Sequence, residues 1–280
     1  MITGRLAPTP SGALHLGNVV AFAAAWLSVR QRDGRLLLRI EDVDRGRSRT
    51  EHADSIRRDL AWLGLTWDSE VPPQSARDYA PIAARLDAFT YFCTCTRRVV
   101  RQAGGLYPGT CRELGHTHGA LRLRLDPGKE SFIDRRHGPQ SASPSAFGDP
   151  VLRTRSGDWA YNLAVVADDI ADGVTEVVRG ADLLHFTTVQ LRLWRLLGGA
   201  PPTWLHTPVV LGRDGRKLSK SEGAQGVEAW RRAGRAPAEV WRIVLPWLGI
   251  EHDDLHAAIQ DFRADGATAS EVKLPELPLL

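Results

Sequence analysis

Residues 2–63 alternate between short apolar runs and longer segments of helical periodicity. Residues 2–7 predict a strand that the Pro/Gly-containing residues 8–12 break, and residues 14–32 predict a buried helix rich in small side chains. A second apolar run, 35–40, predicts another strand, and residues 50–63 carry apolar side chains at helical spacing. This alternation favours an α/β layer fold with a parallel sheet.

Residues 93–150 interrupt this rhythm with Gly- and Pro-containing turns and short alternating pieces, and they predict a small strand-containing insertion. After residue 150 the rhythm resumes with apolar runs, an amphipathic helix over 183–197, a strand over 205–211 and a polar loop over 213–221. Beyond residue 226 the pattern is helical, over 227–232, 237–248 and 253–263.

Composition and charge exclude several classes of protein. Hydrophobic residues make up 43% and charged residues 25% of the 280-residue chain, which is ordinary globular usage and excludes general disorder. The net charge is +3, so a nucleic-acid site must be a local patch. The apolar run 19–29 is shorter than the ~20 residues that span a bilayer. We therefore expect a cytoplasmic protein without a membrane segment or signal peptide.

Three cysteines, Cys93, Cys95 and Cys111, fall within one short stretch. An odd, clustered count does not fit a secreted disulfide framework, and it fits a metal site in a reducing compartment. Three thiolates supply three ligands of a tetrahedral zinc ion, and by residue type His116 or His118 could supply the fourth. The alternative is three buried free thiols.

Two segments are candidates for phosphate chemistry. Residues 8–18, PTPSGALHLGN, connect a strand end to a helix N-terminus, where α/β sheets bind ligands and helix amides favour phosphate. His15 can donate to phosphate oxygens, and Gly12 and Gly17 let a nucleotide approach the backbone. Residues 217–221, KLSKS, place two ammonium groups in a loop, which suits charge that develops on a phosphoryl group. Each segment alone could equally be an ordinary turn or a solvated loop.

Together the two segments resemble the signature pair of the class I aminoacyl-tRNA synthetases. The sequences RIEDVD (39–44), YNLAVVADD (161–169) and GVTEVVRGADLL (173–184) are similar to those of the glutamate-specific branch. The resemblance extends from the start of the chain to about residue 225. It implies a Rossmann-like catalytic domain in two halves, 1–92 and 151–222, with a zinc-containing insertion over 93–150 and a helical C-terminal subdomain over 223–280.

About fifty residues follow the KLSKS loop, whereas full-length synthetases of this branch continue into a large anticodon-binding region. The chain therefore looks most like the glutamyl-Q tRNA(Asp) synthetases, the stand-alone paralogues of the branch. They activate glutamate with ATP and attach it to the queuosine base in the anticodon loop of aspartate tRNA. Asn18 agrees, because full synthetases usually have His there. The alternatives are a truncated glutamyl-tRNA synthetase that charges a tRNA 3′ end and a silent domain that binds RNA or a protein.

The resemblance also implies the functional residues. His15, Lys217 and Lys220 would be catalytic, together with Mg²⁺ and ATP, in a monomer. Glutamate would be bound by Arg5, Leu6, Ala7, Pro8, Thr9, Glu41, Tyr161 and Arg179. ATP would be bound by Pro8, Gly12, His15, Gly17, Asn18, Lys217, Leu218, Ser219, Lys220 and Ser221. Zinc would be held by Cys93, Cys95, Tyr107 and Cys111.

Other positions are less constrained by the resemblance. Asp42 and Asp44 have no assigned role. Val165 stands where charging enzymes typically have an Asn that touches the substrate, so we expect weaker glutamate binding than in a full synthetase. Basic residues in the insertion could follow a tRNA backbone, namely Arg97, Arg98, Arg101, Arg112, Arg135, Arg136 and His137.

Overall fold

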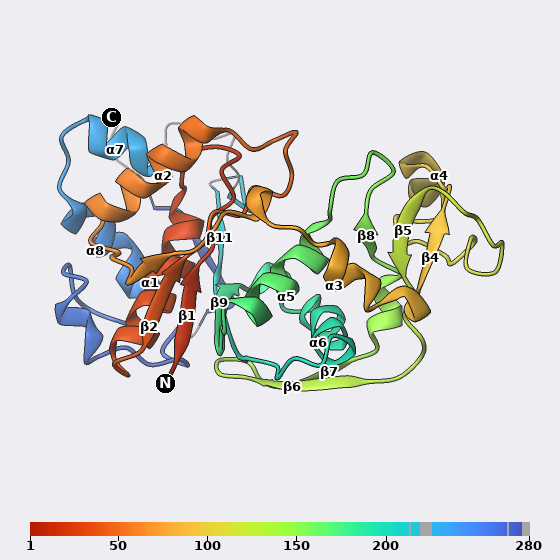
Figure 1. The fold of residues 1–280 in the computed structure, drawn as a ribbon. Helices are drawn as coiled ribbons and strands as arrows, with labels where there is room; N and C mark the ends of the chain where they lie inside the picture. Colours follow the sequence, from red (N-terminus) through yellow and green to blue (C-terminus); the bar gives the residue numbers. More distant parts are fainter. Residues whose placement is uncertain (213, 219–225, 268, 276–280) are drawn as a thin grey trace.

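The structure is a computed structural model, and it describes residues 1–212, 214–218, 226–267 and 269–275 (Figure 1). The strands are β1 (Thr3–Leu6), β2 (Arg35–Leu38), β3 (Ser69–Glu70), β4 (Thr90–Cys93), β5 (Ala120–Leu123), β6 (Glu130–Asp134), β7 (Gly138–Ala142), β8 (Val151–Arg153), β9 (Glu176–Gly180), β10 (Thr203–Thr207), β11 (Val209–Leu211) and β12 (Glu271–Lys273). The helices are α1 (Leu16–Arg30), α2 (Thr50–Trp62), α3 (Ala80–Ala84), α4 (Arg97–Gln102), α5 (Tyr161–Ala171), α6 (Thr187–Leu196), α7 (Val227–Arg232) and α8 (Pro237–Trp247).

Two groups of mostly parallel strands meet in the middle of the molecule. One has the order β1-β2-β3 and the other β7-β6-β10-β9, and within these two groups only β6 and β7 pair antiparallel. A hydrogen bond from the amide of Thr175, just before β9, to the carbonyl of Thr3 on β1 (2.9 Å) joins the two groups. Further along the two strands, Arg5 of β1 donates to the carbonyl of Val178 of β9 (3.2 Å). The carboxyl ends of β1 and β9 therefore also lie side by side, and a ligand site is expected at such a junction.

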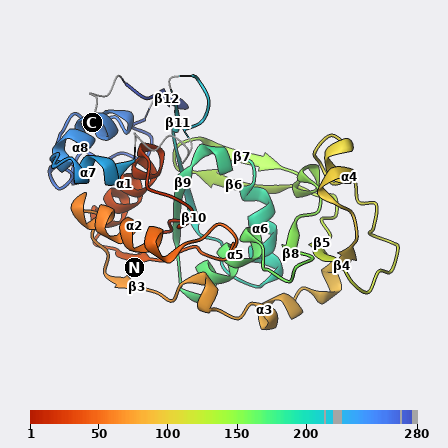
Figure 2. The same ribbon diagram turned by 90° about the horizontal axis from the view of Figure 1, so that it is seen from above.

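Helix α1 is buried along nearly all of its length because it is covered on several sides. It packs against β1 and β9 on one side and against α8 on another (Figures 1 and 2). This explains the apolar composition of residues 19–29, which form a core helix. No helix among the described residues has the length and apolar character that crossing a membrane requires.

The C-terminal helices share the core of the first two strands. Val240, Val244 and Leu245 of α8 belong to the same apolar cluster as Leu27 of α1 and Leu36 of β2. The helix expected over 253–263 is wrong, because only Ala257–Ile259 form a single 3₁₀ turn. The side chain of Gln31 donates to the carbonyls of Ile259 (3.0 Å) and Phe262 (3.1 Å), which fixes this segment by contacts with the end of α1.

The strand expected over 205–211 is divided in two. Pro208 separates β10 from β11, since it has no N–H to donate to a neighbouring strand. After this break, β10 continues the larger sheet, whereas β11 pairs with β12. The described part of the KLSKS loop, Lys217 and Leu218, lies next to β11, because the amide of Leu218 donates to the carbonyl of Val210 (2.8 Å).

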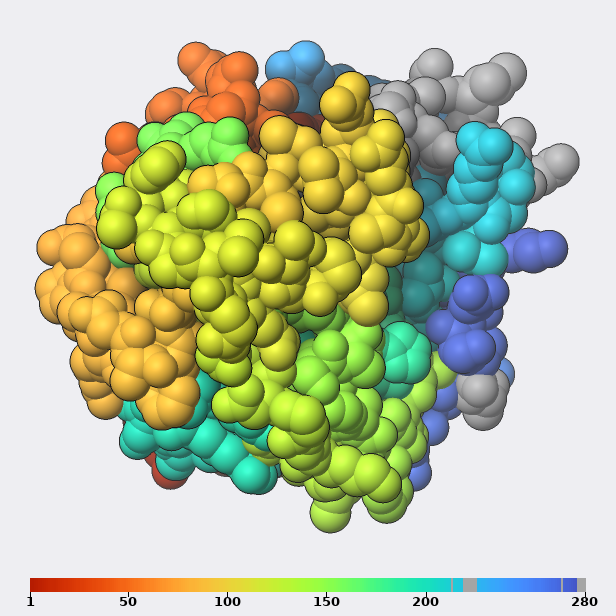
Figure 3. Space-filling view, turned by 90° about the vertical axis from the view of Figure 1, so that its right-hand side faces the viewer, coloured from red at the N-terminus to blue at the C-terminus, as the bar shows by residue number. Residues whose placement is uncertain are grey.

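The residues expected to form the insertion, 93–150, enter two different sheets. Strands β4, β5 and β8 form a small antiparallel sheet that lies with α4 at the far end of the molecule from α1. Figure 3 shows this face, where the yellow and yellow-green residues of this region cover much of the surface. By contrast, β6 pairs with β10 of the central strands, and β7 pairs with the other edge of β6.

A fully buried arginine, Arg39, ties β2 to helix α5. Its guanidinium contacts four carboxylates at 2.7–3.9 Å, those of Glu41, Asp168, Asp169 and Asp172. Asp169 also accepts from Nε of Arg5 on β1 (3.2 Å). Burial alone would lower the pKa of Arg39. The surrounding carboxylates outweigh this effect and hold the pKa well above its ordinary value. One cation thus fixes the relative positions of two strands and a helix.

Replacing Arg39 with Met should destabilise the protein by about 3–5 kcal/mol, because several carboxylates would stay buried without their shared cation. Arg47→Met is the matched control, since Arg47 is exposed and pairs with exposed Asp44, so it should cost about 0–1 kcal/mol. Urea unfolding of the two variants at neutral pH measures both. Equal, small losses would contradict a central role for Arg39.

Candidate active site

A cavity of about 590 Å³ opens where the carboxyl ends of β1 and β9 meet the N-terminus of α1. Most residues expected to bind glutamate line it, namely Arg5, Ala7, Pro8, Thr9, Glu41, Tyr161 and Arg179. Several residues expected to bind ATP line the same cavity, namely Pro8, His15, Gly17, Asn18, Lys217 and Leu218. Segments about two hundred residues apart in the sequence therefore face one cavity.

A few expected residues do not line this cavity. Leu6 is fully buried in the apolar core, and Gly12 is not among the lining residues. Ser219, Lys220 and Ser221 lie outside the described residues.

The first turn of α1 is closed by side chains of the first motif. The amide of His15 donates to Oδ1 of Asn18 (3.2 Å), and the amide of Asn18 donates to the carbonyl of His15 (2.8 Å). Asn18 therefore caps the helix as well as lining the cavity. A Cβ at Gly17 would lie 3.0 Å from the imidazole of His15, so a side chain at residue 17 would push that ring aside.

Lys217 has a partner that the sequence did not indicate. Its ammonium group forms an ion pair with Asp182, which follows β9 and also lines the cavity. Asp182 is half-buried, whereas Lys217 is more than half exposed. The pair connects the loop after β11 to the end of β9.

The two arginines of the cavity have different surroundings. Arg5 donates to Asp169 (3.2 Å) and to the carbonyl of Val178 (3.2 Å), so an anion already contacts its charge. Arg179 donates to His206 (3.1 Å), Gln190 (2.5 Å) and Thr187 (2.8 Å), all of which are buried. These partners could not be predicted from the sequence, because no local motif connects them to β9.

Burial shifts the acidic groups of the cavity in different directions. For Glu41, burial outweighs the attraction of Arg39 and Arg5 and raises the pKa of the carboxyl. For Asp169, the pull of Arg5 and Arg39 outweighs burial and lowers the pKa. Burial raises the pKa of Tyr161, and the nearby Glu41 carboxylate adds to this shift. Tyr161 therefore keeps its proton and can donate it in a hydrogen bond.

Three other positions have mainly structural contacts. Val165 is buried in the apolar cluster around α5 and is not among the residues that line the cavity. Asp42 accepts from the amide (2.7 Å) and hydroxyl (2.6 Å) of Ser75. Asp44 pairs with exposed Arg47, which is itself a lining residue, so Asp44 reaches the cavity only through that arginine.

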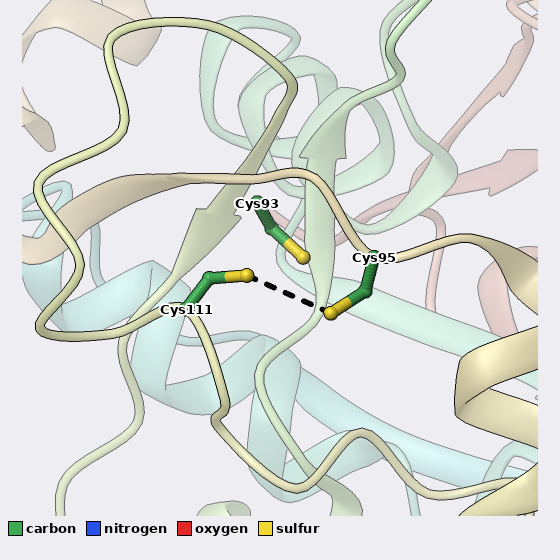
Figure 4. Close-up of side chains that lie close together, drawn as sticks. All are labelled: Cys93, Cys95 and Cys111. Atoms are coloured by element: carbon green, nitrogen blue, oxygen red, sulfur yellow. Dashed lines mark hydrogen bonds between the residues drawn. The ribbon is translucent and has the colours of Figure 1, made fainter.

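The three cysteines converge next to β4 (Figure 4). Their sulfur atoms all lie within 4.8 Å of one another, and those of Cys95 and Cys111 are 3.6 Å apart. Burial opposes a thiolate at Cys111, but hydrogen bonds from the Thr94 amide and Tyr107 hydroxyl lower its pKa to about 6. Three thiols at this spacing could hold one metal ion.

The candidates for a fourth ligand differ in position. The hydroxyl of Tyr107 accepts from the amide of Cys111 (2.8 Å), and its ring packs among the cysteines. His116 contacts Thr94 (3.3 Å), and His118 is exposed. Neither histidine belongs to the group of ligand atoms that lie within 4.8 Å of one another.

Five of the seven basic residues named as tRNA contacts fall into two sets. Arg112 pairs with Asp149 (2.5 Å), Arg135 pairs with Glu176 (2.7 Å), and Arg136 donates to the carbonyl of Ala267 (3.0 Å). These arginines hold the fold together. Arg97 and Arg101, by contrast, line a cavity of about 1000 Å³ with Arg122 and Arg155, between α4 and β8.

Known proteins of similar sequence show the family to which this chain belongs. The profile of the family "tRNA synthetases class I (E and Q), catalytic domain" matches residues 1–103 and 112–270. The glutamyl-Q tRNA(Asp) synthetase of Nitratidesulfovibrio vulgaris is 42% identical, and the alignment covers 100% of this chain and 95% of that protein. The protein of the same name from Deinococcus radiodurans is 42% identical over 89% of this chain and 91% of its own length.

A solved structure supports the fold. The glutamate-tRNA synthetase of Elizabethkingia anophelis superposes with a TM-score of 0.82 at 22% identity, covering 98% of this chain and 68% of that one. At this identity the likeness concerns the fold alone. With the family profile and the full-length relatives, the conclusion is that this chain is an aminoacyl-tRNA ligase of the class I synthetases and belongs to the family of the glutamyl-Q tRNA(Asp) synthetases.

Proposed function

We propose that the cavity binds L-glutamate and ATP side by side, forms glutamyl-adenylate, and transfers glutamate to the queuosine base in the anticodon loop of aspartate tRNA. The observation that carries this proposal is the shared cavity, which Arg5, Glu41 and Arg179 line together with His15 and Lys217. The names of the relatives support the same reaction. The solved glutamate tRNA ligase of Elizabethkingia meningosepticum, described as a complex with its amino acid, has the same fold with a TM-score of 0.80.

The glutamate end of the cavity offers a complement to each charge of the amino acid. Arg179 and Arg5 present guanidinium groups for carboxylates, and Glu41 presents a carboxylate for the α-ammonium. Tyr161 adds a hydroxyl that can donate. Two guanidinium groups and one carboxylate around the same cavity favour an amino acid that carries an α-ammonium, an α-carboxylate and a second carboxylate in its side chain.

In the proposed first step, the α-carboxylate of glutamate attacks the α-phosphorus of ATP, a new P–O bond forms, and pyrophosphate leaves. The chain provides positioning and positive charge for this step, from His15 at the start of α1 and from Lys217 and Lys220 of the loop. Mg²⁺ bound with ATP supplies further charge neutralisation on the phosphates. In the second step a hydroxyl of the queuosine ring attacks the activated carbonyl, an ester forms, and AMP leaves.

Two further cavities next to the active-site cavity offer a path for the nucleic acid. A third cavity of about 340 Å³ shares Tyr161 with the active-site cavity and Val100, Arg122 and Ala160 with the arginine-lined cavity beside α4. We propose that the tRNA approaches along this row, with Arg97, Arg101 and Arg155 beside its phosphates. We also propose a cytoplasmic monomer.

We propose that the cysteine cluster binds zinc with Tyr107 as the fourth ligand. A structural zinc ion would stabilise an irregular region in which Cys93, Tyr107 and Cys111 form only a small apolar cluster of their own. The pKa of Cys111 is lowered to about 6, which favours the thiolate that a metal requires, whereas burial and the neighbouring cysteines raise the pKa of Cys95 to about 11. Metal binding would therefore have to displace the proton of Cys95.

Metal content after dialysis against a chelator tests the zinc site. The wild-type protein should keep one zinc ion per chain, and Cys111→Ser and Tyr107→Phe should lose it, because each removes a ligand. The control variants His116→Ala and His118→Ala should keep the metal. Retention in Tyr107→Phe together with loss in a histidine variant would assign the fourth ligand to that histidine instead.

Lys220→Ala should slow glutamate-dependent ATP–pyrophosphate exchange by about 100-fold or more, because a charge that stabilises the transition state is removed. Arg216→Ala is the control, since exposed Arg216 belongs to the same loop and pairs with exposed Asp214, and it should stay near the wild-type rate. Unchanged thermal unfolding of Lys220→Ala would show that the fold is intact. Near-normal exchange in this variant would remove Lys220 from the ATP site.

The position of the attached glutamate distinguishes the proposed reaction from its alternatives. With radiolabelled glutamate and total tRNA, the label should appear in the anticodon loop of aspartate tRNA after nuclease fragmentation. Label on a 3′ terminal ribose would instead show a truncated glutamyl-tRNA synthetase. If neither labelled tRNA nor ATP–pyrophosphate exchange is found, the chain is a silent synthetase-like domain.

A further inference from the structure

A series of buried polar side chains connects to Arg179 through His206 and Asp134, neither of which lines the cavity. Nε of Arg179, on β9, donates to Nε2 of His206, on β10 (3.1 Å). Nδ1 of His206 lies 2.7 Å from Oδ2 of Asp134, the last residue of β6. All three residues are buried: the exposed fraction is 7% for Arg179, 1% for Asp134 and 0% for His206. We call Asp134, His206 and Arg179 the Asp–His–Arg chain.

The partners of His206 determine which of its nitrogens carries the proton. A guanidinium can only donate, so Nε2 must accept from Arg179, and Nδ1 therefore bears the proton that it donates to Asp134. Burial outweighs the attraction of Asp134 and lowers the pKa of His206 to about 4, so the imidazole is neutral at pH 7. Burial opposes charge on Asp134, but hydrogen bonds from His206 and the amide of His137 (2.9 Å) lower the pKa of this carboxyl.

The remaining partners of Arg179 are neutral as well. Nη1 donates to the amide oxygen of Gln190 (2.5 Å) and Nη2 to the hydroxyl of Thr187 (2.8 Å). Within the described part of the chain, Arg179 forms no ion pair with a carboxylate, whereas Arg5 contacts Asp169. These bonds use three of the five guanidinium N–H groups, and the other two can face a ligand and Tyr161 in the cavity that Arg179 lines.

With this arrangement the orientation of Arg179 can be fixed without neutralising its positive charge. A carboxylate in direct contact with Arg179 would hold the guanidinium in place, but it would also neutralise it and compete with an anionic ligand. Asp134 fixes the orientation of the neutral imidazole, and the imidazole in turn fixes the orientation of Arg179. The negative charge of Asp134 therefore stays one residue further from the cavity. The guanidinium carbon of Arg179 also lies over the indole of Trp204, 5.0 Å from the ring centroid, and this cation–π contact restrains it further.

We infer that His206, oriented by Asp134, is a positioning residue that holds the guanidinium of Arg179 in the orientation from which it donates to a carboxylate of the amino-acid substrate. This inference rests on the proposed function, since it requires glutamate in the cavity. It assigns to His206 and Asp134 a part in substrate recognition, although neither lines the cavity.

Steady-state ATP–pyrophosphate exchange with His206→Asn tests this inference. Asparagine places its amide near the position of Nδ1 and offers nothing at the position of Nε2, so Arg179 loses its fixed acceptor. The KM for glutamate should rise about 10- to 100-fold, because a hydrogen bond to a charged group no longer orients the site. The KM for ATP should change less than about twofold. His206→Gln places an amide oxygen near the position of Nε2 and should restore most of the glutamate affinity.

Val177→Ala is the matched control, because Val177 is fully buried on β9 opposite Trp204 of β10 and its apolar side chain offers no hydrogen bond to the Asp–His–Arg chain. It should lower the melting temperature and leave the KM for glutamate near the wild-type value. If His206→Asn does not fold, Asp134→Asn decides the question, since it keeps the shape and removes the charge that fixes His206. That variant should raise the KM for glutamate about fivefold or more.

The outcomes separate this inference from the function on which it rests. If the wild-type protein shows no glutamate-dependent exchange, the proposed function fails. If the wild type is active but His206→Asn raises both KM values equally, or only lowers the melting temperature as Val177→Ala does, the function stands and the positioning role is wrong. A normal KM for glutamate in Asp134→Asn would also overturn the role.

Discussion

A buried cation without a contacting anion is the feature on which the candidate site depends. Arg39 and Arg5 both contact Asp169, so their charges are compensated inside the protein. Arg179, equally buried, has only neutral partners among the described residues, and burial lowers its pKa. Burying an uncompensated charge costs free energy, and an anionic ligand can recover part of that cost. An anionic ligand in this cavity would therefore meet an arginine whose charge the protein does not already compensate.

The fold makes this possible by joining two groups of strands at β1 and β9. Arg39 connects β2 to α5, contacts Glu41 directly, and is linked to Arg5 because both arginines contact Asp169. On the other side of the junction, the pairing of β6 with β10 brings Asp134 next to His206. Compensated and uncompensated arginines are thus placed by different sheets, and they face the same cavity because β1 and β9 lie next to each other and the cavity opens at the carboxyl ends of both.

Much of this could be predicted from the sequence where a local pattern carries the signal. The strands and helices up to residue 63 follow from apolar periodicity, and the two candidate motifs, at residues 8–18 and 217–221, could be recognised from short segments. Pro208 divides a predicted strand because of one missing N–H, and residues 253–263 are fixed by contacts with Gln31. Partners such as Asp182 for Lys217 could not be predicted, because they depend on how distant segments pack.

Calorimetric titration with L-glutamate and L-glutamine, in the absence of ATP and tRNA, tests the central claim most directly. In the proposed reaction the α-carboxylate, which both amino acids carry, reacts with ATP, so the side-chain carboxylate is the one left for Arg179. The uncompensated charge of Arg179 should therefore make glutamate bind at least about tenfold more tightly than its neutral amide, since a charge-assisted pair is replaced by a weaker hydrogen bond. In Arg179→Met this preference should disappear. Equal binding of the two amino acids by the wild-type protein, or a preference that survives in Arg179→Met, would contradict the claim.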